Sequence, residues 1–210
     1  MRTLNVFLKR LLDIVGSLAA LIVLSPFTLL GMLALYLESG WPLIYSHERV
    51  GLNGKLFRIY KVRSMRVDAD EYLWKAHPEL LEEYKKNGYK LRNDPRVTSV
   101  GRILRRYDIE EIPQFFNVLN GEMSIVGPRA YKPNELQEQG ERYPDSKHHI
   151  EKALTVKPGI TGLWQISGRN HVQFDERIRL DAQYAEQWNI LMDIKILIMT
   201  PLAVFKDHGD

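Results

Sequence analysis

The hydrophobic positions along the chain gather first in one long stretch near its beginning. From Ile14 to Leu37 the sequence reads IVGSLAALIVLSPFTLLGMLALYL and contains no charged side chain. A helix crosses a hydrocarbon core with about 20 such residues, so the stretch is long enough to enter a membrane. A signal peptide fits poorly, because the stretch is too long for its apolar core and no small-residue cleavage site follows before Glu38. We therefore expect a membrane segment that stays on the mature protein, in preference to a buried core helix.

The middle of this stretch carries Ser25 and Pro26. Proline removes a backbone donor and clashes with the preceding turn, so we expect a kink or break at bilayer depth. Lys9 and Arg10 precede the stretch, and the residues after it are also basic on balance, so both flanks are typical of the cytoplasmic side. The residues leave two readings open: a proline-kinked helix that spans the membrane, and a helix that returns to its starting face.

The polar part of the chain begins with a predicted hairpin. Residues 41–67 alternate short apolar runs around an Asn53-Gly54 pair, which predicts two short strands joined by a turn. Residues 68–86 place charged residues and leucines at helical spacing, and Pro78 starts or interrupts a helix there.

A second apolar stretch, residues 190–205, lies near the other end of the chain. Asp193 and Lys195 interrupt it and Pro201 is expected to break it, so we do not expect it to span a membrane. The pattern favours an interfacial amphipathic helix. A helix packed against the protein's own core fits nearly as well.

Charged residues and turn signals concentrate in residues 93–129. Residues 93–95 read Asn-Asp-Pro, which is typical of a turn or a helix cap. Residues 100–104 have the apolar spacing of a short helix, which ends in Arg105 and Arg106.

Glu110 and Glu111 come directly before an apolar pattern that predicts a helix with Pro113 in its first turn. A carboxylate near a helix N-terminus is favoured as an anion, and nearby arginines favour it further. An ionised carboxylate binds Mg²⁺ or attacks phosphorus, and phosphoryl transfer depends mainly on positioning and charge neutralisation. The alternative is that the two glutamates only stabilise the first turn of the helix.

Two further segments present arginines beside glycines. Gly127-Pro128-Arg129 follows an apolar pair and is typical of a turn, and arginine is well suited to phosphate oxygens. Residues 157–170 form a loop punctuated by glycines that contains Trp164 and Arg169. Such a loop could hold a base or a sugar, but a structural turn with Trp164 in the core is the preferred interpretation.

Composition narrows the class of protein. With 210 residues and 45% hydrophobic content, the chain is long enough for one cored domain. Its net charge of +3 does not separate nucleic acid from anionic lipid or nucleotide as a partner. The absence of cysteine excludes disulfides and thiolate sites. P-loop, Rossmann and serine-elbow motifs are absent, and the histidines lack zinc spacing, so those classes are excluded too.

A series of segments resembles the bacterial sugar transferase family, the monotopic polyprenyl-phosphate sugar-1-phosphate transferases, over nearly the whole chain. They are KRLLDIV from Lys9, the Ser25-Pro26 pair, YKVRSM from Tyr60, NDPRVTSVGRILRR from Asn93, EEIPQFFNVLNGEMSIVGPR from Glu110 and KPGITGLWQISGRN from Lys157. This resemblance implies an α+β, mostly helical monotopic membrane protein with a small β-hairpin and interfacial amphipathic helices. Residues 1–40 would form a re-entrant helix that breaks at Ser25-Pro26, and residues 41–210 one catalytic domain at the cytoplasmic face of the bacterial inner membrane.

The resemblance also implies an activity. The family transfers a hexose-1-phosphate from a UDP-sugar to undecaprenyl phosphate and so initiates polysaccharide assembly. The first acid of an Asp-Glu dyad forms a phosphosugar–enzyme intermediate with release of a nucleoside monophosphate, and the second is thought to hold Mg²⁺. Matched by position, Glu110 is the nucleophile and Glu111 the metal ligand. The other positions carried over are Arg105 in the catalytic group, Lys61, Arg63 and Arg129 for phosphate, and Gln114, Asn117 and Arg169 for the pocket.

The sequence departs from the family at the nucleophile, where it has Glu110 in place of aspartate. The extra methylene extends the carboxylate by roughly an ångström, and such a displacement can cost about a hundredfold in rate. This keeps a second reading open, a membrane-anchored assembly or nucleotide-sugar-binding protein of the same fold without turnover. A nucleic-acid binder is disfavoured, and a homodimer is compatible with the resemblance. The sugar, the nucleotide and the pathway do not follow from the residues.

Overall fold

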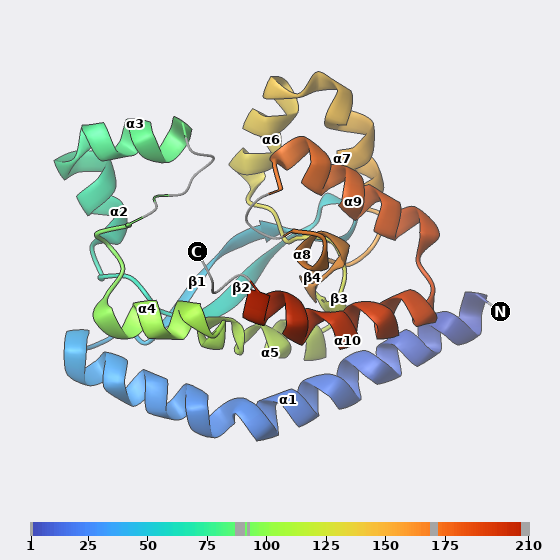
Figure 1. Cartoon of the computed structure of the whole chain (residues 1–210), viewed down its shortest axis with the longest axis horizontal. Helices are drawn as coiled ribbons and strands as arrows, with labels where there is room; N and C mark the ends of the chain where they lie inside the picture. Colours follow the sequence, from blue (N-terminus) through green and yellow to red (C-terminus); the bar gives the residue numbers. More distant parts are fainter. Residues whose placement is uncertain (1, 87–90, 92, 169–171, 207–210) are drawn as a thin grey trace. The chain divides into compact units, whose positions relative to one another are not determined.

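The computed structural model (Figure 1) describes residues 2–86, 91, 93–168 and 172–206. The chain divides into two compact units. The first unit comprises Met1–Leu24, Ser46–Tyr60 and Pro113–Asp210. The second comprises Ser25–Tyr45 and Lys61–Ile112. Each unit is therefore assembled from separated segments of the chain. The predicted boundary at residue 40, between membrane and catalytic parts, stays a prediction.

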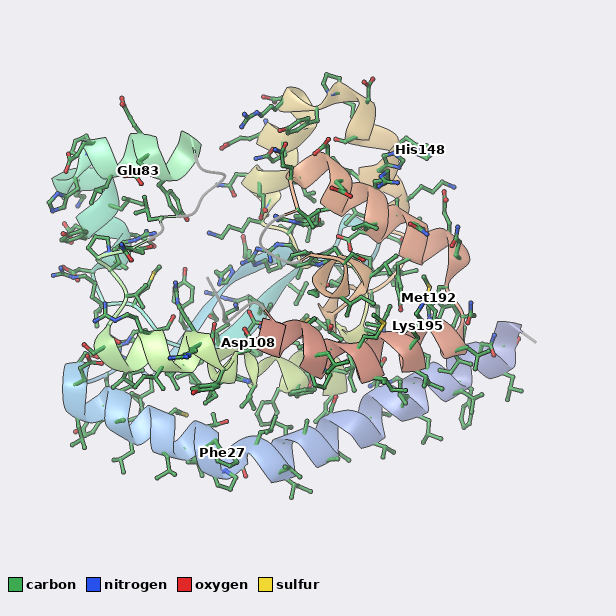
Figure 2. All side chains as sticks on the ribbon, in the orientation of Figure 1. Phe27, Glu83, Asp108, His148, Met192 and Lys195 are labelled. Carbon is green, nitrogen blue, oxygen red and sulfur yellow. The ribbon has the colours of Figure 1, made fainter. Side chains whose placement is uncertain are left out.

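The longest helix, α1 (Arg2–Ser39), contains the entire apolar stretch. It is long and apolar enough to cross a membrane, and only 11% of its most apolar 18-residue window is buried, which argues against a core helix. Figure 2 shows Phe27, the residue after Pro26, projecting outward from α1. Pro26 lies inside the helix, which continues on both sides, so the break is not observed. Loss of one backbone hydrogen bond does not by itself end a long helix. The re-entrant topology stays a prediction.

The predicted hairpin is confirmed. Strands β1 (Ile44–Val50) and β2 (Leu56–Val62) form a two-stranded sheet, joined through the 3-10 turn η1 (Leu52–Gly54). Asn53 and Gly54 both take positive φ angles, of 53° and 79°. Asparagine and glycine reach this left-handed region at the least steric cost, which explains why this pair forms the turn.

The second unit contains most of the short helices that precede residue 113. Its apolar core comprises Leu35, Leu43, Val62 and Leu104. Thr98 caps α4, because its Oγ1 accepts a hydrogen bond from Gly101 N at 2.9 Å. Residues 93–95, for which the sequence predicted a turn or a helix cap, form a turn, because the cap of α4 is Thr98. The elements are α2 (Ala69–Glu71), the π-helical η2 (Tyr72–Ala76), α3 (Pro78–Lys86), α4 (Ser99–Arg106) and the 3-10 helix η3 (Ile109–Glu111).

The first unit surrounds a small parallel sheet of β3 and β4, with Ser124 opposite Gly159 and Val126 opposite Thr161. Helix α9 packs on α7, and α10 packs along α8 and both strands (Figure 1). The elements are α5 (Gln114–Leu119), β3 (Ser124–Val126), α6 (Pro133–Arg142), η4 (Pro144–Ser146), α7 (Lys147–Ala153), β4 (Gly159–Thr161), α8 (Leu163–Ile166), α9 (Phe174–Gln187) and α10 (Ile190–Lys206).

The N-terminal part of α1 is fastened to the first unit by polar side chains. Lys9 Nζ lies 2.8 Å from Asp193 Oδ2 on α10, and that carboxylate is fully buried. Arg10 donates to the carbonyls of Val118 and Leu119 at the end of α5. Asp13 accepts hydrogen bonds from Ser124 Oγ and Ile125 N on β3. Lys9 and Arg10, which the sequence linked to membrane orientation, thus also bind the protein itself.

Helix α10 continues through Pro201, so the predicted break there is wrong. Proline lacks one backbone donor, and on a partly exposed helix that loss does not stop propagation. The helix has two different faces. Asp193 and Ile196 are buried, and four apolar side chains on the other face are exposed: Leu191, Ile194, Ile198 and Leu202. One face therefore packs on the core, and the other has the character of an interfacial helix.

Candidate active site

The two adjacent glutamates lie in η3, directly after α4. Asp108, labelled in Figure 2, forms the turn with a left-handed backbone (φ 53°, ψ 22°), which aspartate adopts more readily than most residues. Its carbonyl accepts a hydrogen bond from Glu111 N at 3.1 Å. Helix α5 begins at Gln114, after Pro113. The prediction that both glutamates precede that helix is confirmed, although they occupy a separate 3-10 turn.

Glu110 is a buried carboxyl group with one unsatisfied oxygen. The residue is 8% exposed, and its Oε2 has no hydrogen-bond partner among the described residues. Burial raises the pKa of Glu110 to about 7, the negative charge of Glu111 adds to the rise, and Lys61 opposes it. At neutral pH the group therefore exists in both protonation states. A buried carboxyl with a pKa near neutrality and an unpaired oxygen is typical of a functional group.

Glu111 has a different environment from its neighbour. Its Oε1 lies 2.5 Å from Lys61 Nζ, and the two side chains are 32% and 24% exposed. Lys61 lies near the end of β2, so the hairpin carries a cation to the dyad. The structure thus gives Lys61 a partner in the dyad, a role compatible with the predicted phosphate contact.

Arg105 supplies positive charge from the end of α4. Its Nε donates a 2.8 Å hydrogen bond to Ser64 Oγ, which orients the exposed guanidinium. Its charge interacts with Glu110 and with Asp94. The structure therefore brings the charge of Arg105 near Glu110, and the catalytic role of Arg105 stays a prediction.

Arg63 has a role that the sequence did not predict. It is buried, and its Nη2 donates to Ser39 O, Ser39 Oγ and Gly40 O at the end of α1. The last carbonyls of a helix lack intrahelical donors, and a cation satisfies them well. This cap accounts for Arg63 better than the predicted phosphate contact does.

Gln114 and Asn117 are buried on α5 in the first unit. Asn117 Oδ1 accepts from Tyr60 N, and its Nδ2 donates to Arg58 O and Glu122 Oε2. These bonds hold β2 against α5, so Asn117 has a structural role, and its predicted pocket role stays a prediction. The pocket role of Gln114 stays a prediction.

Arg129 lies in the turn after β3, where the sequence placed it. Its backbone N–H donates to Asp181 Oδ2 at 3.2 Å, and its guanidinium lies 5.5 Å from the centroid of the Trp164 ring. Trp164 is only 6% exposed, which confirms its assignment to the core. Arg169 lies outside the described residues.

Sequence reasoning missed Asp181, which is fully buried on α9. A signal was present, because Asp181 falls on the same helical face as Phe174 and Ile178, both of which are buried. A charged residue on an apolar face needs a partner, and here the hydroxyl of Tyr131 donates to Asp181 Oδ2 at 2.8 Å.

The dyad also has the ligand chemistry for a divalent cation. Among the described residues no group of three or more acidic or imidazole side chains converges on one point. Mg²⁺ commonly takes only one or two carboxylates and completes its shell with water and substrate phosphates. Glu111 and the unpaired oxygen of Glu110 fit such a site, in which the substrate supplies the remaining ligands.

Comparison with known proteins gives a consistent result. A family model described as bacterial sugar transferase matches residues 4–207. The undecaprenyl-phosphate galactose phosphotransferase of Salmonella typhimurium is 44% identical over 211 residues, covering 97% of this chain and 41% of that protein. The exopolysaccharide production protein ExoY of Sinorhizobium fredii is 41% identical over 204 residues, covering 96% and 87%.

The undecaprenyl-phosphate glucose phosphotransferase of Komagataeibacter xylinus is 37% identical over 197 residues, covering 91% of this chain and 35% of that protein. The chain thus spans less than half the length of the two phosphotransferases and most of the length of ExoY.

Proposed function

The chain belongs to the bacterial sugar transferase family, and on that premise we propose that it transfers a hexose-1-phosphate from a UDP-sugar to undecaprenyl phosphate. Relatives named for phosphotransfer to undecaprenyl phosphate and for exopolysaccharide production support this acceptor and a role in initiating polysaccharide assembly. A relative from Erwinia amylovora named UDP-galactose-lipid carrier transferase supports a UDP-sugar as donor.

The observation that carries the proposal is the environment of Glu110. Its buried carboxyl has an oxygen without a partner among the described residues and a pKa of about 7, beside the Lys61–Glu111 ion pair. A carboxylate attacks phosphorus only when it is ionised, and low hydration makes the ionised form more reactive. At neutral pH a fraction of Glu110 is ionised, and its carboxyl is shielded from water. The neighbouring Lys61–Glu111 ion pair supplies charged groups beside it.

The reaction proceeds in two displacements at the same phosphorus atom. A Glu110 oxygen bonds to the β-phosphorus of the UDP-sugar, and the bond from that phosphorus to the bridging oxygen breaks, so UMP leaves with the electron pair. An oxygen of undecaprenyl phosphate then bonds to the phosphorus, and the acyl phosphate bond to Glu110 breaks. The products are undecaprenyl diphosphate sugar and the regenerated carboxylate.

The cations of the chain stabilise the negative charge that develops on the phosphates. Lys61 and Arg105 do so beside the two glutamates. Lys61 pairs with Glu111, and the charge of Arg105 interacts with that of Glu110. Arg129 is assigned to donor phosphate by its match to the family motif, and its guanidinium suits phosphate oxygens. Arg63 has no role in this mechanism, because its guanidinium donates to the last carbonyls at the end of α1.

Mg²⁺ would be held by Glu111, with Glu110 close enough in sequence to share it. When bound, it neutralises the diphosphate and the charge that develops on the leaving UMP. Lys61 Nζ donates to Oε1 of Glu111, so the cation and the metal would lie on the same carboxylate.

The longer side chain of Glu110 has a structural consequence. Its Oε2 is buried, so the carboxylate must rotate outward to reach a substrate. Glutamate has one more rotatable bond than aspartate and can make that excursion from a buried resting position. The substitution of the family's aspartate is thereby compatible with turnover.

The membrane arrangement follows from exposed apolar surface. Helix α1 is exposed along its apolar stretch, and α10 exposes an apolar face. We place both in the cytoplasmic leaflet of the bacterial inner membrane, with α1 re-entrant, because the acceptor is a lipid and the donor is water-soluble. A homodimer is compatible with this arrangement.

The experiment that tests the function measures UMP release by the nanodisc-embedded protein with Mg²⁺, undecaprenyl phosphate and a panel of UDP-sugars. We expect release with one or a few of the sugars. Glu110→Gln should abolish it, since an amide cannot form the acyl phosphate, and Glu110→Asp should retain or raise it. Glu83→Gln, which changes an exposed glutamate on α3, is the matched control and should behave as wild type (Figure 2).

Absence of release from the wild type, with activity only in Glu110→Asp, would reject turnover. The chain would then be a membrane-anchored nucleotide-sugar-binding or assembly protein of the same fold. Release that survives in Glu110→Gln would instead reject Glu110 as the nucleophile.

A further inference from the structure

Neighbouring residues hold Arg129 at both its backbone and its guanidinium. The backbone N–H donates to Asp181 Oδ2 on α9 at 3.2 Å. The guanidinium lies over the indole of Trp164 on α8, 5.5 Å from the ring centroid. One residue of α9 therefore holds the backbone of Arg129, and one of α8 contacts its guanidinium.

The turn that carries Arg129 is itself rigid. Gly127 N donates to Thr161 O at 2.9 Å, and Gly159 N donates to Pro128 O at 2.8 Å. A Cβ atom on Gly127 would lie 2.4 Å from Lys157 O, so only glycine allows the two backbones to approach this closely. The turn after β3 is thus bound to β4, and Arg129 leaves it in a defined direction.

Arg177 on α9 completes the cluster. It is buried, its guanidinium lies 4.8 Å from the centroid of the same Trp164 ring, and its Nη2 donates to Val172 O at 3.0 Å. Two guanidinium groups over one indole repel each other, and their charges both interact with Asp181. Asp181 is therefore an acidic group that acts on both arginines, and Glu135 also acts on Arg177.

Asp181 is costly to bury, which indicates a role beyond packing. It is fully buried, and burial raises its pKa to about 7, whereas the hydrogen bonds from Tyr131 and Arg129 and the charges of Arg129 and Arg177 oppose the rise. Its Oδ1 has no partner among the described residues. An apolar side chain would pack α9 against the sheet at a lower desolvation cost. What such a side chain lacks is an acceptor for the Arg129 backbone and a counter-charge for the arginines.

We propose that Asp181 and Arg177 are positioning residues that hold Arg129 in the geometry for binding the diphosphate of the nucleotide-sugar donor. Asp181 acts on the backbone N–H of Arg129, and Arg177 acts through the Trp164 ring that both guanidiniums contact. The inference rests on the proposed function, which assigns Arg129 to donor phosphate. Neither residue need touch the substrate, because each acts through Arg129. Preorganised donors bind phosphate better than mobile ones, since less side-chain freedom is lost on binding.

The test measures binding, so it does not depend on turnover. The dissociation constant of UDP with Mg²⁺ is determined by calorimetry on the full chain in nanodiscs, for the wild type, Arg129→Met, Asp181→Asn and the double variant. We expect each single substitution to weaken UDP binding by about tenfold or more, the loss typical of a charge-assisted hydrogen bond. The double variant should bind no more weakly than Arg129→Met, because Asp181 acts only through Arg129.

Two matched controls lie on the same helix. Asp175→Asn changes an exposed aspartate of α9, and Arg179→Met changes an exposed arginine there. Both should bind UDP as the wild type does. If Asp181→Asn does not fold, the comparison of Arg177→Met with Arg179→Met tests the proposal instead. Arg177→Met should weaken UDP binding several-fold, and Arg179→Met should leave it unchanged.

Three results would overturn the proposal. Wild-type affinity in Asp181→Asn and Arg177→Met would show that neither residue positions anything. Losses that multiply in the double variant would show that Asp181 acts independently of Arg129. If the wild type and Arg129→Met bind UDP equally well, or neither binds it, the assignment of Arg129 to donor phosphate is wrong. Absence of UMP release, with this coupling intact, would reject the transfer activity and leave the positioning in place.

Discussion

At the scale of residues, the chemistry rests on two adjacent carboxyl groups with unlike surroundings. Glu110 is buried and has a pKa of about 7, whereas Glu111 is about a third exposed and paired with Lys61. Environments that separate neighbouring carboxyls in this way commonly assign them different roles. In the proposed mechanism they distinguish Glu110, the attacking group, from Glu111, the group that holds charge.

The pH dependence of the rate follows from Glu110. We expect kcat/KM for UMP release to rise with pH with a midpoint near 7, because attack requires the ionised form. Lys61→Met should move the midpoint upward, since the lysine charge opposes the rise in the pKa of Glu110. Initial rates across the neutral range test this. A midpoint in the ordinary range of an exposed glutamate would contradict it.

The same group makes stability depend on pH. Folding raises the pKa of Glu110 from 4.5 to about 7, so between these values the folded state binds more protons than the unfolded state. Stability from this group is therefore greatest below that window and falls as pH rises through it. Glu110→Gln should exceed the wild type in stability above the window by about 1–3 kcal/mol.

Thermal unfolding in nanodiscs at pH values above and below the window measures this difference. Glu83→Gln serves as the exposed control and should show no such trend. Equal pH dependence in the wild type and Glu110→Gln would contradict the buried environment of Glu110.

Sequence reasoning predicted Glu110, Glu111 and Arg105 as site residues because their spacing and the family motif agree, and in the structure the charge of Glu110 interacts with those of Arg105 and Glu111. Arg63 and Asn117 were predicted to contact ligand, and the structure shows that they also bind backbone groups at the end of α1 and in β2. A polar residue in a motif satisfies a backbone group or a ligand equally well, and only the fold distinguishes the two.

At the scale of elements, the position of α4 depends on Gly101. A Cβ atom there would lie 2.0 Å from Ser64 O, the backbone of the residue whose hydroxyl binds Arg105. This close contact joins the helix that carries Arg105 to the segment after β2. It is a packing constraint that no periodicity in the sequence reports.

Gly101→Ala should therefore destabilise the protein by about 2 kcal/mol or more, because α4 must move away from Ser64, and it should lower UMP release as Arg105 is displaced. Gly140→Ala in α6 is the matched control, since its Cβ would lie 3.4 Å from Ile150 Cδ1, an ordinary contact. Alanine there should be neutral or stabilise the helix by up to about 1 kcal/mol. Equal effects of the two substitutions on thermal unfolding would contradict the constraint.

The elements themselves were largely predictable. The hairpin, α4 and α5 follow from turn chemistry and apolar spacing. Pro26 and Pro201 were expected to break helices that continue through them, because the cost of a proline is local and the surrounding helix outweighs it. The parallel pairing of β3 with β4 joins strands of three residues each, which are too short for a sequence pattern to predict.

At the scale of the whole molecule, α1 carries an apolar stretch long enough to enter a membrane, and its part up to Leu24 belongs to the first unit. Its Lys9, Arg10 and Asp13 bind α10, α5 and β3, just before the apolar stretch begins. The membrane segment is thereby tied to the sheet that carries the turn of Arg129. Sequence reasoning found the segment but not these ties, because its partners lie more than 100 residues away.

Breaking the pair of Lys9 and Asp193 should be strongly destabilising. Lys9→Met leaves Asp193 buried without its cation, which typically costs about 3–5 kcal/mol. The double variant Lys9→Met with Asp193→Asn should recover part of the loss, since it removes the uncompensated charge. Lys152→Met, which removes a half-exposed cation near Glu186, is the control and should cost less than about 1 kcal/mol. Equal losses from Lys9→Met and Lys152→Met in thermal unfolding would contradict this anchor.

The central claim is that Glu110 becomes covalently attached to the phosphosugar. The most direct measurement incubates the protein with Mg²⁺ and its UDP-sugar without the lipid acceptor, and follows the mass of the intact protein and of the peptide that contains Glu110. The account predicts an added hexose phosphate on that peptide, equimolar release of UMP, and loss of the added mass when undecaprenyl phosphate is supplied. Unchanged mass in an enzyme that turns over with both substrates present, or a label on a peptide that lacks Glu110, would contradict it.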